Sequence, residues 1–386
     1  MRVLLHTGKG GVGKTSVALA TAMAAARHGH RVFVLSTDTA HSLGDALGRR
    51  VGVRPTPVAE GVVAQEVGVV DELDRGWTEI QAWLRTLLRD DADAMVADEL
   101  LVFPGLEELL CLRAIRAVEA TGEFDVCVVD CAPTGSTLRM LRFPDALRIF
   151  MEQLFDLERR GVRALRPLLG PLGAGRMLPS ESFFDAFERL YRDVDDVRQI
   201  LLDTDRTSAR LVVNPARVVV AESRRSYAYL CLYGVATDAV LVNRLLPDRA
   251  AGGYFARWAD RQNEELREIE ESFPVPRFHA PLHAAEPIGP DALAQLGREL
   301  FDDLDPAGML VRQPPIRLRK RGGRTLLEID LPGISKDELD VVALGAELHV
   351  RVRDAARRIA LPASLEGRAV ESLRFDGGRL EIVLGP

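Results

Sequence analysis

The chain has 386 residues, of which 47% are hydrophobic and 28% are charged, so it is long enough for two domains and able to bury a large core. Its formal net charge of −7 at pH 7 argues against a nucleic-acid-binding surface spread over the molecule, and we expect no nucleic-acid partner. No apolar run reaches the roughly 18 residues of a membrane span, and the N-terminus leaves no room for a signal peptide, which predicts a cytoplasmic protein.

A glycine-rich loop near the N-terminus carries the first functional signal. Residues 8–15 read GKGGVGKT and match the phosphate-binding pattern G-x-x-x-x-G-K-[ST], between the apolar run Val3–Leu5 and an alanine-rich helical pattern. Backbone N–H groups of such a loop hold phosphate oxygens, while its lysine reaches the β and γ phosphates and its hydroxyl residue binds magnesium. The sequence therefore predicts an ATP and magnesium site formed by Gly8, Lys9, Gly10, Gly11, Val12, Gly13, Lys14, Thr15 and Ser16.

The next strand-like run, Arg31–Leu35, is followed by the polar segment STDTAHSL at 36–43. Because this segment follows a strand of the same sheet, we expect it at the carboxyl edge, beside the phosphate loop. We predict that Asp38 orients the attacking water with general-base character, since phosphoryl transfer depends mainly on positioning and electrostatics. The alternative is that Asp38 only caps the following helix. His41 could sense the γ-phosphate or simply pack.

A second acidic candidate closes the apolar run at 124–130, FDVCVVD. An apolar strand that ends in an acid is the Walker B arrangement, so Asp130 is predicted to hold the magnesium ion together with Thr15. The loop that follows, Ala132–Arg139, is interrupted by proline and glycine and is predicted to act as a switch. The four cysteines include no C-x-x-C pair, and Cys127 lies in the apolar run, where we expect it to be a core residue.

The order of the elements predicts the fold class. Strand-like runs alternate with helical patterns through about residue 301, which predicts an α/β fold of the phosphate-loop type, with a mostly parallel sheet covered by helices on both faces. Two segments, about 71–120 and 145–204, are predicted to be helical insertions. The strand-like runs in the first 301 residues, besides Val3–Leu5, are Arg31–Leu35, Val62–Val67, Val126–Val129, Ala209–Val213 and Ala239–Val242.

The pattern changes after Phe301. Residues 302–315 lose periodicity and end in two prolines, as expected of a linker. Beyond it, residues 316–386 form short alternating runs broken by glycine, proline and aspartate, which predicts a small all-β sandwich. The expected strands are Ile316–Lys320, Thr325–Asp330, Glu347–Arg353, Arg357–Leu361, Ala369–Phe375 and Arg379–Leu384.

Four motifs in order, GKGGVGKT, STDTAHSL, PGLEELL at 104–110 and DCAPTGSTLRML at 130–141, resemble the ArsA-type anion-transporting ATPases. This family includes the ATPase that targets tail-anchored membrane proteins. The resemblance spans about residues 1–300 and implies an ATPase that works as a nucleotide-bridged homodimer. It also implies that Lys9 of each subunit reaches the ATP of the other, so Lys9 and Lys14 join Asp38 as catalytic candidates. Asn243, Pro281 and Leu282 stand where the family contacts adenine.

Several positions depart from the family pattern. Thr39 replaces a proline and Ser136 a histidine in the switch motifs, which leaves ATP binding as the firmer expectation and the rate of hydrolysis open. Ala216 stands where the family usually has glutamate, so we expect that a dimer contact of the family is lost here. The chain also lacks the zinc-binding C-x-x-C of the targeting ATPases, and it has neither the second ATPase half nor the metalloid cysteine cluster of arsenite pumps.

The C-terminal segment has a resemblance of its own. The stretches LEIDLPGISKDEL at 327–339, ELHVRV at 347–352 and DGGRLEI at 376–382 resemble the α-crystallin domain of small heat-shock proteins. This domain could serve as a packing module that covers the ATPase, or its exposed strand edges could dock a hydrophobic client or a partner.

The apolar stripe at helical spacing in 183–194 could pack on its own domain or line a client groove, as helices of this region do in the family. We therefore expect an ATP-hydrolysing homodimeric switch that binds hydrophobic polypeptide segments, as a chaperone or a membrane-protein targeting factor, which is compatible with a transient membrane-associated receptor. The alternative is the energising subunit of an anion or arsenite transporter. A third hypothesis is a scaffold in which ATP is mainly structural.

Overall fold

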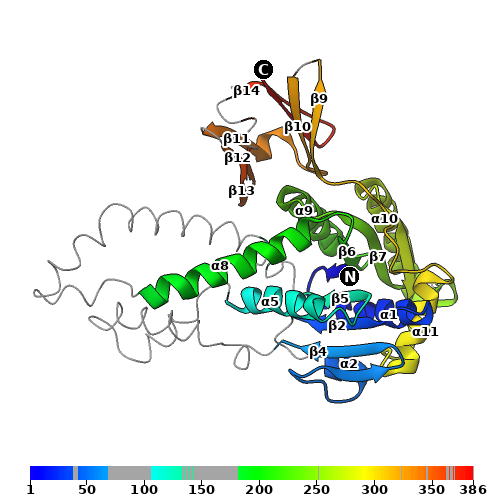
Figure 1. Cartoon of the computed structure of the whole chain (residues 1–386). Coiled ribbons are helices and arrows are strands. Elements are labelled where there is room, and N and C mark those ends of the chain that lie inside the picture. The colour runs from blue at the N-terminus through cyan, green and yellow to red at the C-terminus, as the bar shows by residue number, and fades with distance from the viewer. Residues whose placement is uncertain are drawn as a thin grey trace, which may run out of the picture.

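A computed structural model of the chain (Figure 1) contains an eight-stranded sheet flanked by helices and a C-terminal pair of smaller sheets. The structure describes residues 1–37, 42–67, 106–132, 135, 138, 141, 181–250, 252–322, 324–344, 347–361, 365, 368 and 370–385. Asp38 and His41, the PGLEELL motif up to residue 105, and Ser136 in the switch loop lie outside the described residues, as do the greater parts of the two expected helical insertions.

The large sheet has the strand order β3-β4-β2-β5-β1-β6-β7-β8. All of its described pairings are parallel except that of β3 with β4, so the predicted mostly parallel sheet is confirmed. Its strands are β1 (Arg2–Thr7), β2 (Val32–Ser36), β3 (Thr56–Ala59), β4 (Val62–Glu66), β5 (Val126–Asp130), β6 (Thr207–Val213), β7 (Thr237–Leu245) and β8 (Arg277–Pro281).

Helices cover both faces of this sheet. They are α1 (Lys14–Arg27), α2 (Ser42–Leu47), α5 (Leu106–Thr121), α8 (Glu181–Leu202), α9 (Arg217–Tyr233), α10 (Ala256–Ser272) and α11 (Pro290–Phe301), with short 3-10 segments at Asp248–Ala250 and Gly253–Phe255. Because side chains alternate along a strand, neighbouring residues of β1 enter different cores. Leu4 packs with α1, α2 and α11, whereas Val3 and Leu5 pack with α5, α8 and α9.

The helices α1 and α11 lie close together on the first of these faces. Gly297 of α11 sits where a Cβ atom would come within 2.5 Å of the backbone oxygen of Ala20 in α1. The absence of a side chain at this point therefore lets the two helices approach each other closely. Since α1 starts directly after the glycine-rich loop, the contact helps to fix the position of that loop.

The C-terminal region is an antiparallel β structure, as predicted. One sheet has the order β14-β15-β10-β9 and the other β11-β12-β13. Buried apolar residues of both sheets, such as Ile329, Ile382 and Val350, belong to one core. The strands are β9 (Ile316–Arg321), β10 (Arg324–Asp330), β11 (Leu339–Leu344), β12 (Glu347–Val352), β13 (Ala355–Ala360), β14 (Val370–Asp376) and β15 (Arg379–Leu384), with a 3-10 turn at Lys336–Glu338.

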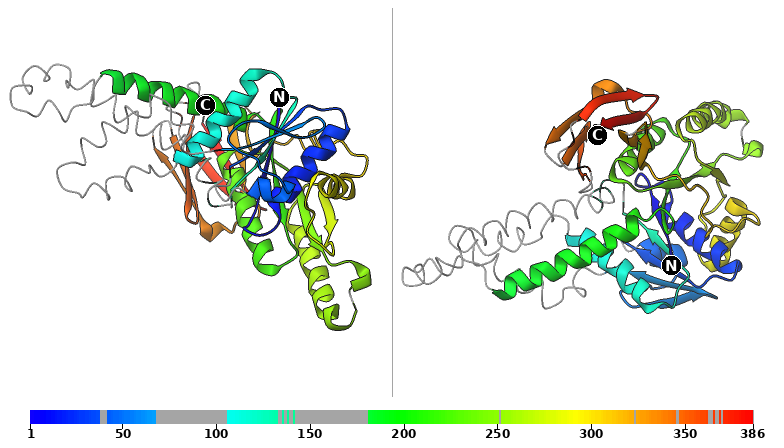
Figure 2. Two further views of the ribbon diagram at one scale, coloured as in Figure 1. Left: turned by 90° about the horizontal axis from the view of Figure 1, so that it is seen from below. Right: turned by 45° about the horizontal axis from the view of Figure 1, so that its top comes forward.

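The sandwich docks on α9, as Figure 1 and the turned views of Figure 2 show. The whole second half of α9, from Ser226 to Tyr233, is buried. A helix that is buried on all sides must be covered from more than one direction. The large sheet covers one side of α9 and strands β10 and β13 cover another, so a single apolar core runs from one domain into the other.

A buried ion network holds the segment between the domains. Arg210 and Asp238 are both fully buried and pair at 3.1 Å, and Arg2 pairs with the same carboxylate at 2.9 Å. Arg210 also donates to the backbone oxygen of Pro306 at 2.7 Å, and Arg2 to that of Ala307 at 3.3 Å. Burial raises and the two arginines lower the pKa of Asp238, and the net direction is downward, so the carboxylate stays charged.

Candidate functional site

The glycine-rich loop lies between β1 and α1, at the carboxyl edge of the large sheet. Gly13 precedes α1 in the left-handed conformation, with φ of 91°, and a Cβ atom there would lie 2.5 Å from Nδ2 of Asn243. Only glycine satisfies both conditions at low cost. The loop thus brings the free N–H groups of the first turn of α1 to the surface, where the helix dipole favours an anion.

Thr15 and Asp130, which were predicted from separate motifs, meet at the base of the loop. The hydroxyl of Thr15 donates to Oδ2 of Asp130 at 2.7 Å and lies 3.0 Å from the hydroxyl of Ser42. Asp130 is fully buried at the end of β5, which pairs directly with β1. The three side chains supply only oxygen atoms, the donor type that magnesium prefers. This donor set fits a magnesium ion that would also be bound by phosphate oxygens.

The two lysines of the loop take different directions. Lys14 is 7% exposed, and its Nζ donates to the backbone oxygen of Lys9 at 3.3 Å, across the concave side of the loop. The side chain of Lys9 is 36% exposed and bonds to the carboxylate of Glu222 on α9. The sequence singled out both lysines, but nothing in it pointed to Glu222, which lies 213 positions away.

A cavity of about 600 Å³ opens beside the loop. Asn243 and Arg244, at the end of β7, form one of its walls and are tied to the loop by hydrogen bonds. Nδ2 of Asn243 donates to the backbone oxygen of Val12 at 2.9 Å, and the Arg244 guanidinium donates to that of Gly11 at 2.9 Å. The lining residues are Gly11, Gly13, Lys14, Thr15, Ser16, Ser42, Asp45, Ala46, Asn243, Arg244, Pro281, Leu282, His283, Ala284, Ala285, Glu286, Pro287, Ile288 and Leu296.

The structure brings together most of the residues predicted to bind nucleotide. One cavity is lined by part of the loop together with Asn243, Pro281 and Leu282, although they come from three distant parts of the chain. The loop residues that line it are Gly11, Gly13, Lys14, Thr15 and Ser16, whereas the predicted residues Gly8, Lys9, Gly10 and Val12 are not among those that line it. Sequence reasoning missed Ser42 and Arg244. Ser42 belongs to the segment STDTAHSL at 36–43, in which only the aspartate and the histidine were considered as functional residues. Arg244 follows Asn243 directly and has a positive φ of 61°, which no pattern in the sequence signalled.

The residues beneath the loop are buried. His6, on β1 just before the loop, is fully buried, and its Nε2 lies 3.0 Å from the hydroxyl of Thr21 on α1. Burial, followed by the charge of Arg210, lowers the pKa of His6 to about 3. Cys127 is also fully buried in β5, and burial raises the pKa of its thiol to about 12, so its assignment to the core is confirmed. Neither side chain is available as a ligand of the nucleotide.

Comparison with known proteins defines the family. The anion-transporting ATPase model matches residues 1–302, which include the loop, Asp130 and the cavity, and a model of the HSP20-like domain found in ArsA matches residues 322–384. The chain belongs to the anion-transporting ATPase family. Members of this family hydrolyse ATP, and the chain is therefore an ATPase with a C-terminal HSP20-like domain, as both resemblances predicted.

Relatives of this chain cover both domains. A protein of Chlorobaculum tepidum, provisionally described as an arsenical pump-driving ATPase, is 36% identical over 371 residues, which cover 95% of this chain and 92% of the relative. An Aquifex aeolicus protein with a similar provisional description is 31% identical over the full length of both chains. An ATPase ASNA1 homolog of Babesia bovis is 29% identical and covers 72% of this chain and 75% of its own length.

None of the helices that the structure describes is long and apolar enough to cross a membrane. Within the same part of the chain, no group of three or more histidine, cysteine, aspartate and glutamate side chains is placed to hold a metal ion. Cys127, Cys131 and Cys231 are each buried.

Proposed function

We propose that this ATPase is a magnesium-dependent homodimeric switch in the cytoplasm that binds hydrophobic polypeptide segments. The contact between Thr15 and Asp130, beneath a loop that opens on a cavity of about 600 Å³, carries the nucleotide part of this proposal. We assign residues 1–301 to the ATPase domain, 302–315 to the linker and 316–386 to the sandwich. For each predicted site residue we propose the role that its sequence motif suggested.

In the proposed site each group has one task. The triphosphate lies along the loop from Gly8 to Ser16, where N–H groups, the α1 dipole and Lys14 neutralise its charge. The purine lies between Asn243 and the segment Pro281–Leu282. When bound, magnesium neutralises charge on the β and γ phosphates. Thr15 and Asp130 would hold it there, and Asp38 is proposed to orient the water. Asp38→Asn should abolish turnover and leave ATP binding intact, and unchanged turnover would refute the assignment.

The dimer is proposed because there is one phosphate loop per chain and its second lysine does not face its own cavity. Lys9 is partly exposed and bonds to Glu222, outside the residues that line the nucleotide cavity. From that position it can contact the phosphates of a second subunit that approaches the same sheet edge. Lys9→Ala should weaken ATP-dependent dimerisation, measured by sedimentation over a range of protein concentrations. Arg249→Ala, which removes a cation at another site beyond the same edge, is the control.

The client is proposed to be an apolar helix or strand. The first half of α8 carries an apolar stripe in its sequence. The second half packs in the core of the ATPase domain through the buried residues Val194 and Val197. A helix whose root is fixed in the core can present its other end to a client. The direct test is mass spectrometry of proteins that co-purify with the Asp38→Asn variant in ATP. Apolar segments recovered with ATP and absent with ADP support the proposal, and their absence in both states contradicts it.

The second candidate is the energising subunit of an anion transporter, which the descriptions of the Chlorobaculum and Aquifex relatives favour. The two candidates differ in what stimulates hydrolysis. Stimulation by arsenite or antimonite would favour the transporter, whereas stimulation by a hydrophobic helical peptide would favour the polypeptide-binding switch. A transient membrane-associated receptor is compatible with both candidates.

A further inference from the structure

The ion pair between Lys9 and Glu222 connects the nucleotide loop to α9. Both side chains are partly exposed, at 36% for Lys9 and 27% for Glu222. A partly exposed ion pair is held weakly and exchanges easily. A bound triphosphate offers the ammonium group of Lys9 several charged oxygens in place of a single carboxylate. A triphosphate that reached Lys9 would therefore compete with Glu222 for it.

The other end of the same helix carries the sandwich. Glu222 is in the second turn of α9, and Leu232 lies ten residues later, which is about 15 Å along a helix. There the Arg357 guanidinium of β13 donates to the backbone oxygen of Leu232 at 2.7 Å. This oxygen belongs to the last turn of α9, where a cation also interacts favourably with the helix dipole. The hydroxyl of Tyr229 donates a hydrogen bond to the carboxylate of Asp354. Polar contacts from the sandwich therefore hold the final two turns of α9.

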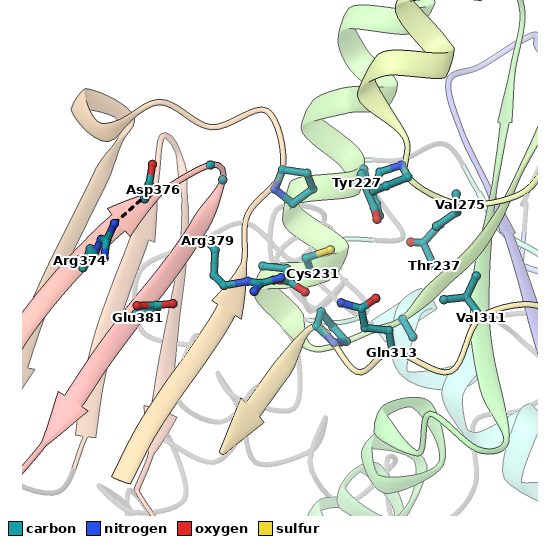
Figure 3. Close-up of a pocket in the computed structure, with 17 residues that line it drawn as sticks. Tyr227, Cys231, Thr237, Val275, Val311, Gln313, Arg374, Asp376, Arg379 and Glu381 are labelled. Atoms are coloured by element: carbon teal, nitrogen blue, oxygen red, sulfur yellow. Dashed lines mark hydrogen bonds and ion pairs between the residues drawn. The ribbon is translucent and has the colours of Figure 1, made fainter. Parts of the chain in front are cut away.

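The contact between the domains is incomplete. A cavity of about 600 Å³ lies beside α9, between the ATPase domain and the β14–β15 hairpin (Figure 3). Tyr227, Cys231 and Thr237 line it from the ATPase domain, and Arg374 and Arg379 line it from the hairpin. Among the residues that the structure describes, none forms a hydrogen bond with the buried hydroxyl of Thr237. Because protein interiors are normally close-packed and their polar groups paired, this side of the interface is easier to open than the apolar core that joins the domains around α9.

We propose that Glu222 is a positioning residue that holds Lys9 away from nucleotide, and that α9 transmits the release of Lys9 to the sandwich and loosens its docking. The inference rests on the proposed function, in which Lys9 contacts ATP phosphate. The sandwich has two states, one docked on α9 and one loosened from it. Nucleotide shifts the equilibrium toward the loosened state, because only in that state is Lys9 released from Glu222 and able to bind phosphate. The sandwich is then a module whose exposed surface depends on the nucleotide state.

Cys231 supplies an internal reporter of docking. It lies on the second half of α9, is 3% exposed and lines the cavity between the domains. Burial raises the pKa of its thiol, so it should react slowly while the sandwich is docked. Loosening the sandwich should expose the thiol and speed its reaction. Cys127, fully buried in the middle of the large sheet, provides the reference that should not respond.

The experiment is pulsed alkylation of the full chain with N-ethylmaleimide, followed by peptide mass spectrometry. Addition of a non-hydrolysable ATP analogue with magnesium should speed labelling of Cys231 about tenfold or more relative to Cys127. Glu222→Gln should raise the rate without nucleotide and remove most of the response to it, and Glu222→Asp should restore the response. Glu270→Gln is the control, because it weakens a different exposed ion pair, between Glu270 of α10 and Arg277 of β8, that does not involve Lys9.

The variants separate this inference from the proposed function. Lys9→Ala breaks the same pair from the other side, so it should raise labelling as Glu222→Gln does, and the double variant should add nothing further. Binding of a fluorescent ATP analogue is measured on the same samples. If the analogue binds but Cys231 labelling is unchanged by nucleotide and by Glu222→Gln, the inference is wrong and the nucleotide site stands. If the analogue does not bind, the proposed function fails, and unchanged labelling in Glu222→Gln without nucleotide overturns the inference independently.

Discussion

The buried histidine beneath the phosphate loop makes the stability of the ATPase domain depend on pH. His6 is fully buried, and its Nε2 lies 3.0 Å from the hydroxyl of Thr21. Its pKa falls from 6.5 to about 3, first because burial disfavours the charged ring and then because of the nearby Arg210 charge. In the unfolded chain the ring is in water and titrates at its ordinary value.

The difference between the folded and unfolded pKa of His6 sets the sign and the size of the pH effect on stability. Between pH 6.5 and about 3 the unfolded chain binds a proton that the folded chain does not, so the free energy of unfolding falls as the pH falls. Each pH unit well inside this window contributes about 1.4 kcal/mol, so roughly 2 kcal/mol of stability should be lost by pH 5. Above pH 7 both states carry a neutral ring, and the contribution is constant.

The assay is urea unfolding of the wild type and of His6→Leu at several pH values between 8 and 5. The variant lacks the titrating ring, so its stability should fall less on acidification. The difference in the free energy of unfolding between the two proteins should therefore shift by about 2 kcal/mol toward the variant over this range. A difference that stays constant with pH would show that His6 is protonated freely in the folded state, and would refute the reasoning.

Three further predictions concern the rest of the fold. Asp238→Asn leaves two buried arginines without their carboxylate and should lower the free energy of unfolding by about 3–5 kcal/mol in urea, whereas Asp125→Asn, in an exposed ion pair, should change it little. Gly13→Ala should weaken the binding of a fluorescent ATP analogue about tenfold or more, because the added Cβ meets a fixed side chain in a left-handed backbone, and unchanged affinity would contradict this. Arg357→Met removes the bond to the last turn of α9 and should cost about 1.5–3 kcal/mol, whereas the exposed Arg358→Met should be neutral, so equal effects would argue against docking through Arg357.

The nucleotide site could be predicted because its signals are local. The loop spacing, the strand before it and the helix after it all lie within residues 3–23, and Asp130 ends an apolar strand of its own. The contact of Thr15 with Asp130 then follows from the order of strands in a parallel sheet. Strands with weaker patterns were missed. β3 contains Pro57, which an edge strand tolerates, and β11 starts directly after a short 3-10 turn.

The contacts between the domains could not be predicted in the same way. In α9 the second half carries apolar and aromatic residues on all sides, but only the docked sandwich explains why they are buried. Arg357 and Leu232 lie 125 positions apart, and Lys9 and Glu222 lie 213 apart. Such pairs depend on how whole elements pack, which neither propensity nor periodicity encodes. The sandwich was therefore predicted as a fold, while its docking site was not.

The central claim is that two chains share two nucleotides through Lys9, and complementation tests it most directly. The Lys9→Ala and Lys14→Ala variants should each be nearly inactive alone. The two variants are then mixed in equal amounts under conditions in which dimers exchange subunits. In a mixed dimer, one loop keeps its own Lys14 and receives Lys9 from the other chain. Half of the dimers are mixed and each has one complete site, so the mixture should recover about a quarter of the wild-type ATPase rate. No recovery, with mixed dimers demonstrated by mass spectrometry, would show that Lys9 acts within its own chain and would contradict the account.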